Sequence, residues 1–94
     1  MIYLADIGGE SRTRVLVLNG RRFPRATGRC IVAPDAEVPM VGYRPAPWEI
    51  ECEDMLFSLA FLLTIPESTL WDRVGEPPVA VLNRARRIAT RFMF

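Results

Sequence analysis

The chain has 94 residues, of which half are hydrophobic and about a quarter are charged. This length and composition are typical of one soluble globular domain, residues 1–94. The net charge is +1 and the pI is about 7.8, below the range above about 9 that is typical of nucleic-acid-binding domains. The first residues lack a basic leader followed by an apolar run, so we expect a cytoplasmic protein without a signal peptide.

Histidine and lysine are absent, so all 12 cationic side chains are arginines. Histidine is the commonest general base and metal ligand, and the chain also lacks a Gly-rich phosphate loop and a Gly-x-Ser-x-Gly motif. The carboxylates of Glu51, Glu53 and Asp54 are clustered in sequence, but such density is more typical of a solvated edge than of an acid–base pair. We therefore predict a protein that is not an enzyme and binds no metal or cofactor.

Two short strands are predicted at the N-terminus. Ile2–Ile7 is an apolar run that ends at two glycines, and Thr13–Leu18 is rich in branched side chains. The dipeptide Asn19–Gly20 follows directly. Both of its residues tolerate positive φ, so it predicts a two-residue hairpin that pairs Leu16 with Phe23.

The middle of the chain is predicted to continue the sheet and then to form a loop. Arg29–Ala33 is a candidate strand after a break at a glycine. The proline-rich stretch 34–47 predicts a long connection with one extended piece at Val38–Arg44. Trp48–Glu53 alternates apolar and acidic residues, which favours a strand slightly over a helix that starts after a proline.

The longest apolar run, Met55–Ile65, is predicted to be a helix at the centre of the fold. A helix that is apolar on every side is either buried or spans a membrane. About 11 residues rise only about 16 Å, which is too short for a span. We therefore expect a core helix that begins near Asp54, and no membrane-spanning segment.

Two further helices are predicted after it. Residues 66–75 begin with proline and end with glycine, with Leu70, Trp71 and Val74 facing inward. The last helix, after Pro77, has a continuous apolar arc on one side. The predicted fold class is α+β: an N-terminal antiparallel β-meander of three to five short strands, packed against two to three C-terminal helices.

The two cysteines, Cys30 and Cys52, match no zinc or redox spacing. We expect two reduced thiols in the core, and a disulfide between them is the alternative.

Two arginine segments are the clearest candidate contacts. Three arginines of the last helix recur at i, i+3 and i+7 and so share a face, and the other segment surrounds Phe23. The ordinary interpretation is a solvated surface, and the functional one is contact with phosphates or with an acidic protein. The candidate contact residues are Arg21, Arg22, Arg25, Arg84, Arg87 and Arg91.

Aromatic residues point to a protein interface. Tyr43 and Trp48 lie in or beside the proline-rich loop. Phe92 and Phe94 end the chain, where apolar residues usually dock on the core or on another subunit. These four residues are candidate interface anchors, and we expect a protein partner, with a homodimer as one form of it.

The function predicted from these observations is that of a small non-catalytic protein-binding module. In its most concrete form it is an inhibitor or adaptor that occupies a partner's surface, as phage and mobile-element antagonists of host systems do. One alternative is a nucleic-acid-binding protein that uses the arginine-rich hairpin and the C-terminal helix. Another is a subunit of a larger assembly. Convergence of the two arginine segments on one face would favour nucleic acid.

Overall fold

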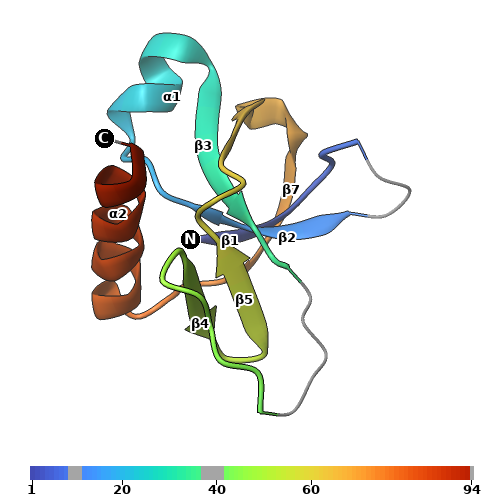
Figure 1. Cartoon of the computed structure of the whole chain (residues 1–94). Helices are drawn as coiled ribbons and strands as arrows, with labels where there is room; N and C mark the ends of the chain where they lie inside the picture. Colours follow the sequence, from blue (N-terminus) through green and yellow to red (C-terminus); the bar gives the residue numbers. More distant parts are fainter. Residues whose placement is uncertain (9–11, 37–41, 94) are drawn as a thin grey trace.

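The computed structural model describes residues 1–8, 12–36 and 42–93, which form a mostly β structure with one long helix at the C-terminus (Figure 1). Its elements are β1 Ile2–Ala5, β2 Thr13–Val17, α1 Arg22–Thr27, β3 Arg29–Pro34, β4 Glu49–Cys52, β5 Met55–Ser58, β6 Leu63–Pro66, the 3-10 helix η1 Glu67–Thr69, β7 Leu70–Gly75 and α2 Val79–Met93. Five strands form an antiparallel sheet in the order β6-β3-β2-β1-β7, and β4 and β5 form a separate hairpin.

The five-stranded sheet is rolled into a partly open barrel. Its two edge strands, β6 and β7, follow each other in the chain and are joined by the three residues of η1. So short a connection reaches from one edge to the other only if the sheet curls until its edges approach. The barrel interior is filled by small and branched side chains, namely Ala5, Val15, Cys30, Val32 and Ile65.

A second core lies on the outer face of the barrel, beneath the β4–β5 hairpin and α2. Leu16 and Ala33 of the sheet are fully buried in one cluster with Phe57 of β5 and Ala85 of α2. The small alanine side chains on both sides let the helix approach the sheet closely. The hairpin is also tied to the sheet through its backbone, since Asp35 forms an antiparallel bridge with Phe57.

Several sequence predictions are confirmed. Strands β1, β2 and β3 lie where they were expected, and the amphipathic last helix is α2, with Ala85 and Ala89 buried. The strand interpretation of Trp48–Glu53 is confirmed by β4, in which Ile50 and Cys52 are buried on the same face. Period-two and period-3.6 patterns therefore predict elements that have one buried face.

The predicted central helix, Met55–Ile65, is wrong. Strand β5 occupies its first four residues, a turn follows, and β6 begins at Leu63. All four residues of β5 are buried, so this strand lacks the alternation that marks a half-exposed one. A continuous apolar run does not separate a strand buried on both faces from a buried helix.

The two-residue hairpin predicted at Asn19–Gly20 is wrong as well. Helix α1 follows this dipeptide, and β2 pairs with β3, so that Leu16 lies opposite Ala33. The side-chain Oδ1 of Asn19 accepts a hydrogen bond of 2.7 Å from the amide of Ile31. The asparagine thus fastens the two ends of the α1 excursion together through its side chain.

Residues 66–75, predicted as a helix, form η1 and β7. Pairing with β1 overrides the local helix signals of the proline and glycine, and Trp71 and Val74 are exposed instead of facing inward. The α+β class with a meander packed against two to three C-terminal helices is therefore wrong. The described part of the chain is mostly β, with a single long helix.

Two further predictions concern the state of the cysteine thiols and the presence of a membrane-spanning helix. Cys30, inside the barrel, and Cys52, on β4, are both free and buried, and burial raises the pKa of each thiol. No helix in the described part of the chain combines the length and apolarity needed to traverse a bilayer. Most of the extended piece predicted at Val38–Arg44 falls outside the described residues.

Candidate functional site

An arginine lies among apolar residues on the outer face of the barrel. Alternate residues of a strand point to the same side, so Arg14 of β2 shares its face with the fully buried Leu16. The side chain of Arg14 is nevertheless 34% exposed, because it reaches the rim of this core. A cation so placed requires a partner, since desolvating an isolated charge is costly.

Asp35, which follows β3 directly, is that partner. Its Oδ2 lies 2.8 Å from Nη2 of Arg14, and only 1% of its side chain is exposed. The amide of Leu56 donates a hydrogen bond of 3.1 Å to Oδ1 of Asp35. The amide of Asp35 in turn donates to the carbonyl of Arg14 at 2.9 Å. Asp35 therefore connects β2 to β5 and fixes the orientation of the guanidinium.

Asp54 brings a second, exposed carboxylate to the same guanidinium. It lies in the two-residue turn between β4 and β5, after Glu53, whose φ of 56° turns the chain. Nη1 of Arg14 is 3.2 and 3.3 Å from the two carboxylate oxygens of Asp54, and 75% of the Asp54 side chain is exposed. The hydrogen bond to Asp54 is the main cause that raises the pKa of Arg14.

The two carboxylates differ in how easily they can leave Arg14. An exposed ion pair contributes at most about 1 kcal/mol to stability, because water screens both charges. Breaking a buried pair costs more, because it leaves a charge without compensation. An incoming anion can therefore displace Asp54 while Asp35 continues to hold Arg14 in place.

A polar cavity of about 250 Å³ opens beside Asp54, with Tyr43, Glu51 and Glu53 in its wall. The hydroxyl of Tyr43 donates a hydrogen bond of 2.6 Å to Oε1 of Glu49, and this bond raises the pKa of Tyr43. The cavity gives a polar ligand room next to Asp54, the exposed partner of Arg14. Within the described part of the chain, these acids do not form a cluster of three that could hold a metal ion.

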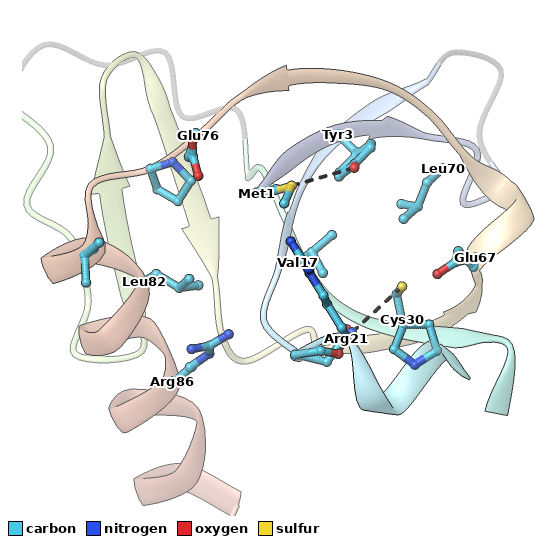
Figure 2. Close-up of a pocket in the computed structure, with 15 residues that line it drawn as sticks. Met1, Tyr3, Val17, Arg21, Cys30, Glu67, Leu70, Glu76, Leu82 and Arg86 are labelled. Atoms are coloured by element: carbon cyan, nitrogen blue, oxygen red, sulfur yellow. Dashed lines mark hydrogen bonds between the residues drawn. The ribbon is translucent and has the colours of Figure 1, made fainter. Parts of the chain in front are cut away.

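A larger cavity of about 430 Å³ opens at one end of the barrel (Figure 2). Cys30 and Leu70 reach it from the barrel strands, and Leu82 and Arg86 reach it from α2. Nε of Arg86 donates a hydrogen bond of 2.6 Å to the carbonyl of Leu18, which ties the helix to the end of β2. This cavity is separate from the Arg14 site, which lies on the outer face.

The predicted arginine contacts are divided between two elements and remain a prediction. The first three lie at or beside α1 and the last three on α2. They border different hollows, since Arg21 lines the cavity at the end of the barrel and Arg84 lines a hollow beside the carboxylates of β4. All six side chains are exposed, namely Arg21, Arg22, Arg25, Arg84, Arg87 and Arg91.

Two of the predicted interface anchors lie together. The rings of Trp48 and Phe92 meet edge to face at 6.3 Å between centroids, and the two residues are 42% and 53% exposed. With Leu62 they border an open hollow of about 460 Å³, and we call this surface the Trp48–Phe92 patch. Tyr43 lies apart at the polar cavity, and Phe94 falls outside the described residues.

Arg14 and Asp35 were not predicted as site residues from the sequence, and Asp54 was interpreted as part of a solvated edge and as the start of a helix. One signal was available, because an arginine at the position of Arg14 shares a strand face with Leu16 and Leu18. No comparable signal marked Asp35, which follows a proline in a segment that was predicted to be a loop.

No protein-family model and no curated protein matches the chain. Solved structures do match it. The Mycobacterium tuberculosis toxin MazF-mt6 is 16% identical with a TM-score of 0.75, over 98% of this chain and 94% of that one. An endoribonuclease from a Mycobacterial species, in complex with its cognate antitoxin, is 16% identical with a TM-score of 0.75, over 98% and 89%. The MazE–MazF structure from Deinococcus radiodurans is 18% identical with a TM-score of 0.74, over 98% of this chain and 88% of that one.

At these identities the matches establish a shared fold. They contradict the predicted non-catalytic inhibitor or adaptor and the prediction that the chain is not an enzyme, because the matched structures are those of an endoribonuclease, the toxin MazF-mt6 and a MazE–MazF pair. The alternative of a nucleic-acid-binding protein agrees better with the fold.

Proposed function

We propose that the chain is an endoribonuclease toxin that cleaves RNA at a phosphodiester bound by Arg14. The observation that carries this proposal is the position of Arg14, a partly exposed arginine with a fixed orientation, on a fold shared with endoribonucleases. Its side chain is one-third exposed, is held by the buried Asp35, and is paired with Asp54, which lines a polar cavity. Similarity to an endoribonuclease structure, with a TM-score of 0.75, supports the assignment to RNA.

Arg14 serves the phosphate in this mechanism. When the 2′-oxygen of a ribose attacks the adjacent phosphorus, a new P–O bond forms while the bond to the 5′-oxygen breaks, and negative charge gathers on the phosphoryl oxygens. A guanidinium donates parallel hydrogen bonds to such oxygens. Because Asp35 already orients Arg14, the cation needs little reorganisation as the charge develops.

Asp54 serves the attacking hydroxyl. A phosphate that binds Nη1 of Arg14 takes the position that Asp54 holds in the free protein. The displaced carboxylate stays next to the phosphate, where it accepts the proton of the 2′-hydroxyl as a general base. Solvent water protonates the departing 5′-oxygen, and the hydroxide that remains takes the proton from Asp54, which restores the carboxylate.

The exposed arginines of α1 and α2 hold the flanking phosphates in this proposal. Arg14 is surrounded by carboxylates and the net charge is only +1, so attraction for RNA has to come from cations elsewhere on the surface. Helix α2 contains no acidic residue, and its three predicted contacts, Arg84, Arg87 and Arg91, are exposed.

A protein partner is also part of the proposal. Two of the structures with this fold contain a toxin with its antitoxin, in one case a MazE–MazF pair. The Trp48–Phe92 patch is an exposed apolar surface with an adjoining hollow, and such surfaces mark protein contacts. We propose that a protein covers this patch, either the antitoxin or a second copy of the chain.

The decisive experiment is cleavage of end-labelled RNA by the purified protein, followed on a denaturing gel. We expect the wild-type protein to cut RNA but not DNA of the same sequence, since DNA lacks the 2′-hydroxyl. The products should carry a 2′,3′-cyclic phosphate and a 5′-hydroxyl. Arg14→Ala should lower the rate by roughly 10²–10³-fold, the range for removing one donor to a developing oxyanion.

The matched control is Arg29→Ala, which removes an exposed arginine at the far end of β3, where it pairs with β6. It should cut at nearly the wild-type rate, and a contaminating nuclease would be revealed by equal cleavage in the Arg14→Ala preparation. Absence of cleavage by the wild-type protein, or cleavage of DNA as fast as of RNA, would overturn the proposal.

A further inference from the structure

We infer that Trp71 and Arg12 form a stacking platform for one unpaired base of the substrate, next to the phosphate held by Arg14. The guanidinium carbon of Arg12 lies 3.7 Å from the centroid of the Trp71 ring. Although Arg12 covers part of the ring, Trp71 remains 56% exposed. This inference rests on the proposed RNA-cleaving function and goes beyond it, because it names the residues that select and position the nucleotide.

The strand register places this platform beside Arg14. Leu4 of β1 pairs with Arg14 of β2. On its other side, β1 pairs with β7 at Tyr3–Arg73 and at Ala5–Leu70, with a register shift between these pairs. Trp71 and Asp72 therefore share the position opposite Leu4, which places Trp71 in or beside the cross-strand row of Arg14. Strands are about 4.8 Å apart, so the backbones of Trp71 and Arg14 are separated by about 10 Å.

The side chains lie on the same side of the barrel. Arg12 lies one residue before β2 and two before Arg14, about 7 Å along an extended chain, and its contact with Trp71 places it on the same outer face. Leu70, the neighbour of Trp71, packs into the barrel interior, and Trp71 contacts Arg12 outside it. A base attached to a nucleotide beside the bound phosphate reaches the indole over this span.

The chemistry of the platform fits an unpaired base better than a folding role. A large ring with 56% exposure contributes little to the core, and the bulge that presents it interrupts the pairing of β7 with β1. Bases of single-stranded RNA stack on indole rings and on guanidinium planes, and the cation adds attraction for the neighbouring phosphates. Base stacking therefore accounts for an exposed tryptophan on the edge strand β7.

The test compares Trp71→Ala and Trp71→Phe with the wild-type protein on an RNA oligonucleotide that carries one abasic ribose, moved along the sequence. We expect Trp71→Ala to raise KM about tenfold on normal RNA, within the range for one base–aromatic stack, and to change kcat little. Trp71→Phe should keep most of the affinity. In the wild-type protein, an abasic ribose at one position should raise KM by the same factor of about ten. In Trp71→Ala, the same abasic ribose should not raise KM further.

A direct binding measurement separates this inference from the proposed function. The chain has two tryptophans, so quenching of fluorescence by single-stranded RNA in the wild-type protein, and its loss in Trp71→Phe, report on Trp71 alone. Quenching by RNA without any cleavage would leave the platform and overturn the nuclease. Cleavage with an unchanged KM in Trp71→Ala, or an abasic penalty equal in both proteins, would overturn the platform.

Discussion

Oδ2 of Asp35 lies 2.8 Å from Nη2 of Arg14, and the two residues differ in exposure, at 1% and 34% of the side chain. The buried carboxylate therefore acts as the fixed member of the pair and the arginine as the member that reaches a ligand. Because Asp35 also accepts a hydrogen bond from Leu56, the position of Arg14 depends on the docking of the β4–β5 hairpin.

This asymmetry predicts unequal costs for removing the two partners. Arg14→Ala leaves a carboxylate buried without its cation and should lower the free energy of unfolding by about 3 kcal/mol, the lower end of the range for a broken buried pair. Asp35→Asn keeps a hydrogen-bond acceptor for Leu56 and lets Arg14 turn to water, so it should cost about 1–2 kcal/mol. Urea unfolding measures both, and the double variant should be less destabilised than the sum of the two. Equal costs would contradict the fixed role of Asp35.

Asp54 is predicted to matter for catalysis and hardly for stability. Asp54→Asn removes an exposed ion pair and should change the free energy of unfolding by less than about 1 kcal/mol. If Asp54 is the general base, the same change should lower kcat for RNA by roughly 10²-fold or more. The matched control is Glu67→Gln, an exposed acid of η1 at the end of the barrel, outside the polar cavity. Wild-type kcat in Asp54→Asn would remove Asp54 from the mechanism.

Elements with one buried face and one exposed face were predictable from the sequence. Elements that are buried on both faces, or exposed on both, were not. Strand β4 shows period two and α2 shows a continuous apolar arc, and both were predicted correctly. Strand β5 is buried on both faces and β7 is largely exposed, so neither carries the alternation on which sequence reasoning depends. Both were mistaken for helices.

The candidate site was less predictable, because it is assembled by pairings between distant segments. Arg14 and Asp54 are 40 residues apart, and they meet only because Met55–Ser58 is a strand that docks on the barrel. When that segment is interpreted as a helix, Asp54 becomes the N-cap of the helix, and nothing in the sequence predicts that it lies near β2. The error in the fold therefore concealed the site.

The two buried thiols predict a loss of stability at alkaline pH. Burial raises the pKa of Cys30 and Cys52 above the ordinary value of 9.0. Their contribution to the free energy of unfolding is therefore complete below about pH 9 and is lost as the pH rises toward the folded-state values, by up to about 1.4 kcal/mol per unit and thiol. Urea unfolding between pH 7 and 10 should show this decline, and the Cys30→Ala, Cys52→Ala double variant should show a smaller one. Parallel curves would contradict it.

The Trp48–Phe92 patch predicts association that can be separated from folding. Replacing both rings with serine removes exposed apolar surface, so the melting temperature of the dilute protein should change little, whereas association with a second copy or an antitoxin should weaken at least tenfold. Light scattering on a sizing column distinguishes the two partners, since self-association shows in the pure protein. The control is Phe61→Ser, because Phe61 is 70% exposed but does not border the hollow. Unchanged association in both cases would place the partner elsewhere.

Glu53 offers a test of the turn that carries Asp54. Its φ of 56° lies in the left-handed region, which costs a residue with a Cβ about 1–2 kcal/mol and which asparagine adopts more readily. Glu53→Asn should therefore stabilise the protein by about 0.5–1 kcal/mol and leave cleavage unchanged, whereas Glu53→Val, with a branched side chain, should destabilise the turn. If the geometry of this turn positions Asp54 against Arg14, Glu53→Val should also lower kcat, and addition of a stabilising osmolyte should restore its folding before its rate. A valine variant that is as active and stable as the wild type would show that the turn does not constrain the site.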